Sequence, residues 1–421
     1  MDLSGIRRAL ERPLPPPRRE AGRSGPSGMT VVSAPTVAAR HVLVVVPAPR
    51  DEQGVAPGTA IAGLPLLRRI VLTALRAGFD RVLVHPLACP DAALIGGTGA
   101  RMLGTGREAR LPSPSRVILL PVNVLPQTRW LNTLREMPLT PDTLAVDGSR
   151  VVAIESHQAG DLLEAAARTT TLEDLVAALP ALPGASPVTC AAGRFTLAAS
   201  GAATAAEDWL LRSLVKEGES FASRHLERRL SLALTRRLVT TRITPNVMTL
   251  VSLAVGLLGA PFFLSEDWRS QLAGALLFLA HSILDGCDGE LARLKFLESR
   301  TGALLDFWGD NLVHAAVFAT MAVGWALATD AVLPLLVGAL AVAGTAAAAS
   351  SMMSRQAIRT REFGDDLTGR VTRALANRDF IYLVILLALF GKAHWFLVLV
   401  AAGSPIFVML AWLGDRPGRT A

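Results

Sequence analysis

The stretch ILDGCDGELARLKFLESRTGALLDFWGD, from Ile283 to Asp310, contains four aspartates and follows directly on an apolar run. A charged side chain at membrane depth costs about 3 kcal/mol on insertion scales, so such residues usually face a polar cavity and serve a function. Asp285 and Asp288 are three residues apart and share one helix face, and Asp306 lies four residues before Asp310 on a second helix. A short connection between these helices would bring the four carboxylates to one cavity.

The clustered carboxylates predict a metal site, because four such groups without bound cations would repel one another. Oxygen-only ligands suit Mg²⁺ or Mn²⁺ better than zinc or copper, and paired metal ions bridged by carboxylates are common in phosphoryl transfer. Gly289 and Gly302 leave room for a phosphate, and Arg293 supplies a cation for it. Helix packing for the glycines and membrane topology for Arg293 are the alternatives.

Long apolar runs dominate the second half of the chain. The sequence has 421 residues, 51% of them hydrophobic, and a mean hydropathy of +0.40. A helix needs about 20 apolar residues to cross a bilayer, and six runs approach that length once flanking residues are added. We therefore predict an α-helical integral membrane domain of six transmembrane helices. The runs are Val247–Leu264, Leu272–Leu284, Gly302–Leu327, Ala331–Ser350, Phe380–Phe390 and Ala393–Trp412.

The net charge of +7 is concentrated at the ends of these runs. Arginines cluster before the first run, between the second and third, and between the fourth and fifth. By the positive-inside rule, both termini and the aspartates face the cytoplasm, in a multi-pass protein of the inner (cytoplasmic) membrane. This placement argues against a nucleic-acid partner, the other interpretation of a high pI. The three cysteines are far apart and predict neither a disulfide framework nor a zinc site.

The front half alternates short apolar runs with helical patterns. HVLVVVP (His41–Pro47) and RVLVHP (Arg81–Pro86) are typical of buried strands, and Pro65–Gly78 between them is typical of an amphipathic helix ended by glycine. Later strands are expected at 116–121 and 194–199. Strand, helix and strand at this spacing predict a cytoplasmic α/β (Rossmann-like) domain with a parallel sheet.

An amphipathic segment joins the two halves. Leu230, Leu234 and Leu238 fall on one helix face with arginines around them, which predicts a helix in the membrane interface among lipid headgroups. A soluble linker helix is the alternative. The predicted organisation is a disordered basic tail at 1–39, the α/β domain at 40–200, amphipathic juxtamembrane helices at 206–243, and the six-helix membrane domain at 244–415.

The aspartate-rich stretch resembles the signature of the CDP-alcohol phosphotransferase (CDP-alcohol phosphatidyltransferase) family. Asp285-x-x-Asp288-Gly289-x-x-Ala292-Arg293 is followed, after eight residues, by Gly302-x-x-x-Asp306-x-x-x-Asp310, which matches the complete signature. ITPNVMT, residues 243–249, is similar to the start of that family's first membrane helix. The resemblance covers about residues 205–415.

The resemblance implies a role for each residue of the signature. Asp285, Asp288 and Asp306 would hold two divalent ions, Mg²⁺ or Mn²⁺, on the pyrophosphate of a CDP-alcohol. Asp310 would lie at the metals too and act as the general base that takes the proton of the acceptor hydroxyl. That hydroxyl would attack the phosphorus bearing the alcohol, and CMP would leave. The residues implied in the nucleotide pocket are Gly289, Ala292, Arg293, Gly302, Asn246 and Thr249.

The front half resembles the sugar-phosphate nucleotidyltransferase domain through AGLPLLRRIVLTALRAGFDRVLV, residues Ala62–Val84. Two catalytic features depart from that family. The loop after Val46 lacks the Gly-rich turn and the lysine that would hold a triphosphate. Val122 and Asn123 stand where a metal-binding aspartate is expected. We therefore expect a degenerate domain, in a fusion that resembles the inositol-1-phosphate cytidylyltransferase fusions.

The resemblance predicts an integral membrane transferase that moves a phosphatidyl-type group from a CDP-alcohol, such as CDP-diacylglycerol, to a hydroxyl acceptor in phospholipid biosynthesis. The alternatives are a CDP-inositol-dependent di-inositol phosphate synthase, a bifunctional enzyme with an active front half, and a membrane scaffold without activity. If the acceptor carries a phosphate, we expect Arg355, Arg359 or Arg361 to bind it. Membrane lipid is the expected environment, and the family resemblance makes a homodimer plausible.

Overall fold

The structure is a computed structural model. It describes residues 40–49, 52, 55–105, 111, 113–157, 159–168, 186–188, 192–199, 201–215, 226–358 and 380–413. The chain divides into two compact units, Met1–Leu210 and Leu211–Ala421, and we describe each by itself. The expected loop arginines Arg359 and Arg361 lie outside the described residues.

The N-terminal unit is built on a seven-stranded sheet with the order β10-β8-β9-β6-β1-β4-β5. The interior strand β1 pairs in parallel with β4 and β6, whereas β9 runs antiparallel to both β6 and β8. The predicted α/β domain is therefore present, but its sheet is mixed and not purely parallel. The strands are β1 (Arg40–Val46), β4 (Arg81–Val84), β5 (Arg101–Met102), β6 (Ser115–Pro121), β8 (Ala145–Asp147), β9 (Val152–Ser156) and β10 (Ser186–Val188).

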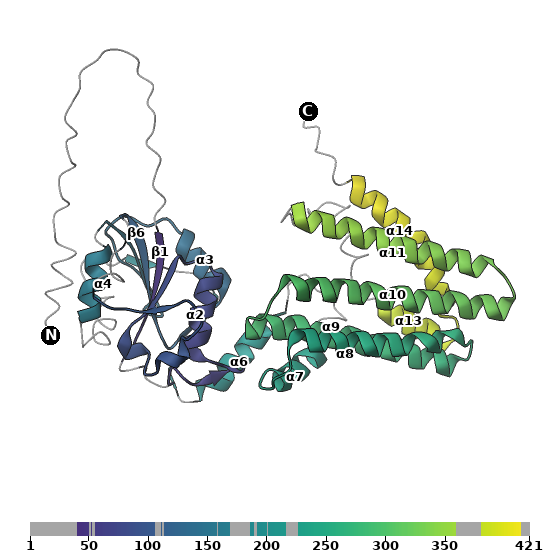
Figure 1. The fold of residues 1–421 in the computed structure, drawn as a ribbon, viewed down its shortest axis with the longest axis horizontal. Coiled ribbons are helices and arrows are strands. Elements are labelled where there is room, and N and C mark those ends of the chain that lie inside the picture. Colours follow the sequence, from purple (N-terminus) through teal and green to yellow (C-terminus); the bar gives the residue numbers. More distant parts are fainter. Residues whose placement is uncertain are drawn as a thin grey trace, which may run out of the picture. The chain divides into compact units, whose positions relative to one another are not determined.

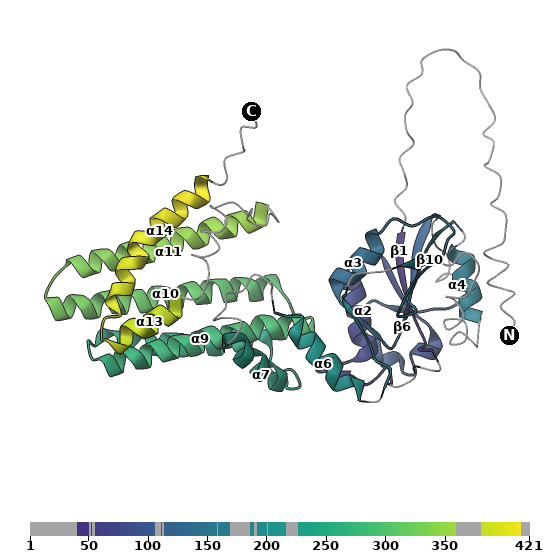
Figure 2. The same ribbon diagram turned by 180° about the vertical axis from the view of Figure 1, so that it is seen from behind.

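Helices cover both faces of this sheet (Figures 1 and 2). Helix α4 lies on one side, while α2 and α3 lie on the other. Val42, Val44 and Val46 of β1 share one buried cluster with Leu163 of α4, as expected for alternate residues of a strand. The helices are α2 (Leu66–Arg76), α3 (Thr128–Glu136), α4 (Ala159–Arg168) and α6 (Ala202–Arg212), with short 3-10 turns η2 (Pro86–Ala88) and η3 (Ala92–Leu94).

Two small ribbons complete the unit. Strand β2 (Ala60–Ile61) pairs with β3 (Leu64–Pro65), and β7 (Val124–Pro126) pairs antiparallel with β11 (Arg194–Thr196). The strand predicted at 194–199 thus exists in part, as β11, but it belongs to this ribbon and not to the main sheet.

The second unit is helical. Its elements are α7 (Arg228–Leu238), α8 (Pro245–Gly259), η6 (Ala260–Leu264), α9 (Trp268–Lys295), α10 (Arg300–Thr329), α11 (Leu333–Ile358), α13 (Phe380–Leu389) and α14 (His394–Leu413). Figures 1 and 2 show α8, α9 and α10 running side by side, and α11 beside α14. Helix α8, extended by η6, packs against both α9 and α10.

Four of these helical segments are long and apolar enough to cross a membrane: Pro245–Leu264, Trp268–Lys295, Arg300–Thr329 and Leu333–Ser350. Two shorter apolar segments, α13 (Phe380–Leu389) and the part His394–Pro405 of α14, occupy the places of the fifth and sixth predicted runs. The described residues thus give four span-length helices, and six spans stay a prediction.

Helix α7 buries its polar face, which the sequence interpretation did not anticipate. Ser231 and Thr235 are buried against the membrane unit, whereas 48% of the Leu230 surface is exposed. The reason is an acidic residue of α9: the side chains of Ser231 and Thr235 both donate to the carboxylate of Glu290. Leu230 is thus exposed, whereas Leu234 and Leu238 are half-buried, and a helix in the membrane interface stays a prediction.

Candidate active site

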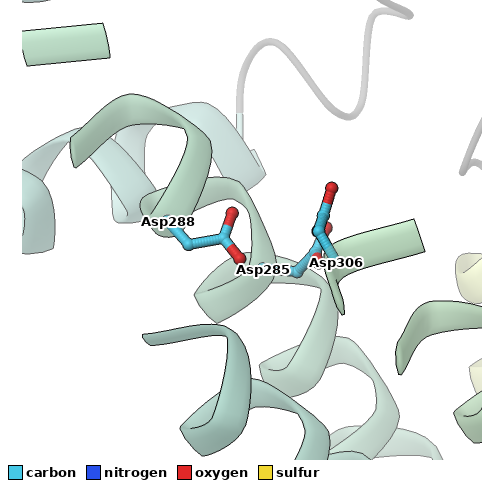
Figure 3. Close-up of side chains that lie close together, drawn as sticks. All are labelled: Asp285, Asp288 and Asp306. Atoms are coloured by element: carbon cyan, nitrogen blue, oxygen red, sulfur yellow. The ribbon is translucent and has the colours of Figure 1, made fainter. Parts of the chain in front are cut away.

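Three of the four aspartates of the signature meet in space. One carboxylate oxygen from each of Asp285, Asp288 and Asp306 lies within 4.8 Å of the others. Figure 3 shows these side chains gathered between two helices, with Asp285 and Asp288 on α9 and Asp306 on α10. Asp285 and Asp288 are each only 5% exposed. Closely spaced carboxylates with little exposure to solvent are typical ligands of hard divalent cations.

The turn between α9 and α10 brings Asp306 close to the two aspartates of α9. Helix α9 ends at Phe296, whose φ of 57° is left-handed, a common way for a helix to stop. Ser299 then caps α10, because its hydroxyl oxygen accepts from the backbone N–H of Gly302 at 3.0 Å. The connection is short enough to return α10 toward the aspartates of α9.

Helix α8 supplies a third wall of the site. The hydroxyl of Thr249 donates to Oδ2 of Asp288, and both residues are buried. The hydrogen bond fixes one oxygen of the acidic cluster from a neighbouring helix. Because the acceptor is a carboxylate, such a bond is stronger than one between neutral groups.

Asp310 lies one helical turn beyond Asp306 and contacts a different partner. Its Oδ1 is 3.4 Å from Nε2 of His281, and His281 lies one turn before Asp285 on α9. Among the described residues, Asp310 does not belong to the group of carboxylates whose oxygens lie within 4.8 Å of one another. The sequence interpretation did not single out His281. The only available signal was a lone histidine inside an otherwise apolar run.

A cavity of about 160 Å³ opens beside the acidic cluster. It is lined by residues of α8, α9, α10 and the turn between α9 and α10, among them Asp288 and Asp306. Leu297, Glu298 and Ser299 of that turn also line it, and the sequence interpretation did not name them. All six residues expected at the nucleotide lie here: Asn246, Thr249, Gly289, Ala292, Arg293 and Gly302.

The two signature glycines lie in tight surroundings. A Cβ on Gly302 would lie 2.9 Å from Oδ1 of Asn246 and 3.0 Å from Oγ of Ser299. A Cβ on Gly289 would lie 3.3 Å from Nη1 of Arg293. A side chain at either position would thus displace another residue that lines the cavity.

A divalent cation fits the donors of this cluster. Every side chain of the group offers a carboxylate oxygen, and hard cations such as Mg²⁺ and Mn²⁺ prefer oxygen ligands. Cys287, the thiol nearest in sequence, is buried and contacts the carbonyl oxygens of Ser231 and Ile283 instead. The donor set therefore favours magnesium or manganese over softer metals.

In the N-terminal unit, Asn123 stands where a metal-binding aspartate is expected. Asn123, which follows β6, is buried, and its Nδ2 donates to Oε2 of Glu52 at 3.0 Å. Nε of Arg150 lies 4.0 Å from the other oxygen of Glu52. In the same unit, burial lowers the pKa of Arg69 to about 10, and its guanidinium donates to the carbonyls of Ile61 and Ala62.

Comparison with known proteins places the second unit in a family. Residues 242–413 match the family model described as CDP-alcohol phosphatidyltransferase. A bifunctional IPC transferase and DIPP synthase of Thermococcus kodakarensis is 40% identical over 114 residues, which is 27% of this chain and 25% of that protein. A CDP-diacylglycerol–serine O-phosphatidyltransferase of Mycobacterium leprae is 34% identical over 99 residues, which is 21% of this chain and 32% of that protein.

The chain thus spans about a quarter to a third of the length of these two curated relatives. A solved structure of a Mycobacterium tuberculosis phosphatidylinositol phosphate synthase with CDP-DAG bound is 20% identical. It aligns with a TM-score of 0.35 over 46% of this chain and 98% of that one. The family match, which contains the complete aspartate signature, identifies residues 242–413 as a CDP-alcohol phosphatidyltransferase domain.

Proposed function

We propose that this chain transfers the phosphoalcohol group of a CDP-alcohol to the hydroxyl group of an acceptor, with release of CMP. The observation that carries the proposal is the convergence of Asp285, Asp288 and Asp306 beside the 160 Å³ cavity. A diphosphate bound in that cavity would lie next to the carboxylates, where its negative charge requires cations.

Asp285, Asp288 and Asp306 are the residues that would hold divalent metal, either Mg²⁺ or Mn²⁺, and we propose two ions. When bound, the metal would stabilise the negative charge that develops on the attacking and leaving oxygens of the phosphoryl transfer. Thr249 would keep the Asp288 carboxylate in position for this role, because its hydroxyl already donates to Oδ2.

The chain's own residues would bind the donor and move the proton. Arg293 lines the cavity and would neutralise part of the diphosphate charge, while Asn246 and Thr249 would contact the nucleotide. Asp310 would accept the proton of the acceptor hydroxyl. The hydroxyl oxygen would then form a bond to the phosphorus that bears the alcohol, the bond from that phosphorus to the CMP oxygen would break, and CMP would leave.

For the donor, we propose a CDP-inositol type of CDP-alcohol, in a reaction of the di-inositol phosphate synthase kind. The Thermococcus relative bears the name of such a synthase, at 40% identity over the aligned residues. The α/β unit ahead of the membrane domain, similar to a nucleotidyltransferase, supports the same assignment. The second candidate is phosphatidyl transfer from CDP-diacylglycerol in phospholipid biosynthesis, which the Mycobacterium leprae relative favours.

The N-terminal unit would serve this enzyme without making the CDP-alcohol itself. Asn123 cannot act as an anionic magnesium ligand, and its amide is already hydrogen-bonded to Glu52. A degenerate domain kept for scaffolding or regulation is consistent with these contacts. CTP-dependent formation of a CDP-alcohol by the purified chain would contradict this part of the proposal.

In the membrane, we propose six spans, with α13 and α14 completing the four span-length helices. The arginine-rich connections would place the aspartates, the cavity and the N-terminal unit on the cytoplasmic side of the inner membrane. A homodimer is the assembly that we propose, and crosslinking in native membranes would test it.

The test is CMP release by the full chain purified in detergent with Mn²⁺ or Mg²⁺. CDP-inositol and CDP-diacylglycerol are offered separately, each with inositol 1-phosphate, inositol or glycerol 3-phosphate as acceptor. We expect turnover of CDP-inositol, and we expect Asp310→Asn to reduce it to a small residual rate. Turnover of CDP-diacylglycerol alone would select the second candidate, and turnover of neither donor would refute the proposed function.

A further inference from the structure

We propose that His281 is a positioning residue that holds the carboxylate of Asp310 in place for the acceptor hydroxyl. The inference rests on the proposed function, because it assigns to Asp310 the role of base. It concerns a histidine outside the aspartate signature, on the turn of α9 that precedes Asp285.

The imidazole of His281 is fixed by its surroundings. The side chain is 4% exposed, and Nδ1 lies 2.9 Å from the backbone carbonyl oxygen of Ser252 on α8. A carbonyl oxygen can only accept, so Nδ1 carries the proton of this hydrogen bond. The ring also stacks on Phe278 at a centroid distance of 6.1 Å and an interplanar angle of 15°.

The packing of α8 makes room for this ring. A Cβ on Gly256 would lie 3.0 Å from Cγ of His281 and 2.6 Å from Cγ1 of Val313 on α10. Only a glycine lets the three helices approach so closely at this level. The imidazole therefore has little freedom to rotate or withdraw.

The second ring nitrogen points to the proposed base. Nε2 is 3.4 Å from Oδ1 of Asp310. With Nδ1–H bonded to Ser252, a second proton on Nε2 makes this contact an ion pair and leaves the Asp310 carboxylate able to act as a base. His281 thus links α8, through Ser252, to α10, through Asp310. One oxygen of Asp310 is held at His281, while the carboxylates of Asp285, Asp288 and Asp306 form the tight group.

This arrangement separates two tasks among the four aspartates. Three carboxylates converge as cation ligands, and the fourth is held by an imidazole that is itself locked to the backbone. A base that must meet a hydroxyl group at a fixed angle benefits from such support, because small misplacements of reacting groups lower the rate strongly.

The test compares His281→Ala, His281→Gln and His314→Gln in the full chain. His314 provides a matched control, because it is an imidazole on α10 one turn beyond Asp310 whose ring packs against Phe278, Phe318 and Phe380. The readouts are kcat for CMP release, KM for the CDP-alcohol, the Mn²⁺ concentration for half-maximal rate, and the melting temperature.

We expect His281→Ala to lower kcat at least tenfold, with KM and the Mn²⁺ requirement changed less than twofold. His281→Gln should recover part of kcat, because its amide can donate to the Asp310 carboxylate. His314→Gln should keep kcat within twofold. If His281→Ala does not fold, the same comparison is made with His281→Gln, which must then lie between the wild type and Asp310→Asn.

A double-variant cycle separates this inference from the proposed function. In the Asp310→Asn background, His281→Ala should change the residual turnover less than twofold, because the group that it positions is gone. Full activity of Asp310→Asn would refute the base and with it the proposed mechanism. An inactive Asp310→Asn together with a His281→Ala variant of normal kcat would refute only the positioning role. Equal losses of kcat in His281→Ala and His314→Gln would refute it as well.

Discussion

Replacing Arg228 by alanine would remove the guanidinium that contacts a fully buried carboxylate in the membrane unit. Glu290 of α9 has no exposed surface. Its Oε1 accepts from Nη1 of Arg228 at 2.8 Å and from the hydroxyl of Ser231 at 2.8 Å, and its Oε2 accepts from the hydroxyl of Thr235 at 2.6 Å. The three donors belong to α7, so this carboxylate attaches the juxtamembrane helix to a helix of the active site.

The magnitude follows from these contacts. Removing one partner of a buried ion pair costs about 3–5 kcal/mol, because the remaining charge loses its compensation. The Arg228 side chain is 18% exposed, and two hydroxyl donors remain at Glu290, so we expect the lower end, about 3 kcal/mol. A unit of this size shifts its melting temperature by about 2–4 °C per kcal/mol, which predicts a decrease of roughly 6–12 °C.

The assay is thermal unfolding of the detergent-purified chain, followed by tryptophan fluorescence. Arg229→Ala is the matched control, because Arg229 is the neighbouring arginine of α7 and is exposed; it should shift the melting temperature by less than 2 °C. The double variant Arg228→Ala/Glu290→Gln should recover most of the loss, since it removes the buried charge. A decrease below 2 °C for Arg228→Ala, or no recovery in the double variant, would refute this reasoning.

Three further outcomes test the site. Thr249→Val should raise the Mn²⁺ concentration for half-maximal CMP release at least tenfold, because Asp288 loses a hydrogen bond worth about 1.5–3 kcal/mol. Thr249→Ser should behave like the wild type, and equal behaviour of the valine and serine variants would contradict this. Gly302→Ala should raise KM for the CDP-alcohol about tenfold, or about 1.4 kcal/mol, because its Cβ would displace Asn246; an unchanged KM would show that Asn246 does not contact the donor. Removal of divalent metal with EDTA should abolish CMP release, and Mn²⁺ or Mg²⁺ should restore it; activity that persists in EDTA would count against a metal role for the aspartates.

The aspartate cluster could be predicted from the sequence because its geometry depends on helix periodicity alone. Residues three and four apart share a helix face, so the spacing of Asp285 and Asp288 determined their common face before any packing was known. The short turn to Asp306 then determined which helices meet. The strands at β1, β4 and β6 were predictable for a similar reason, since each is a continuous apolar run.

The contacts that depend on tertiary packing were not predictable. Nothing in the local sequence of α7 shows that its hydroxyl-bearing face meets Glu290, because that partner is 55 residues or more away. The role proposed for His281 likewise depends on its contacts with Ser252 and Asp310, which belong to two other helices. Strands β8 and β10 have three residues each, too few for a periodic pattern.

The most direct test of the central claim is the dependence of CMP release on both the metal and the aspartates that would hold it. The wild-type chain and Asp306→Asn are titrated with Mn²⁺ at a saturating concentration of CDP-inositol and inositol 1-phosphate. We predict a saturable activation of the wild type and at least a hundredfold lower rate for Asp306→Asn at every Mn²⁺ concentration. Equal rates for the two proteins would contradict the assignment of this cluster as the metal-dependent phosphotransfer site.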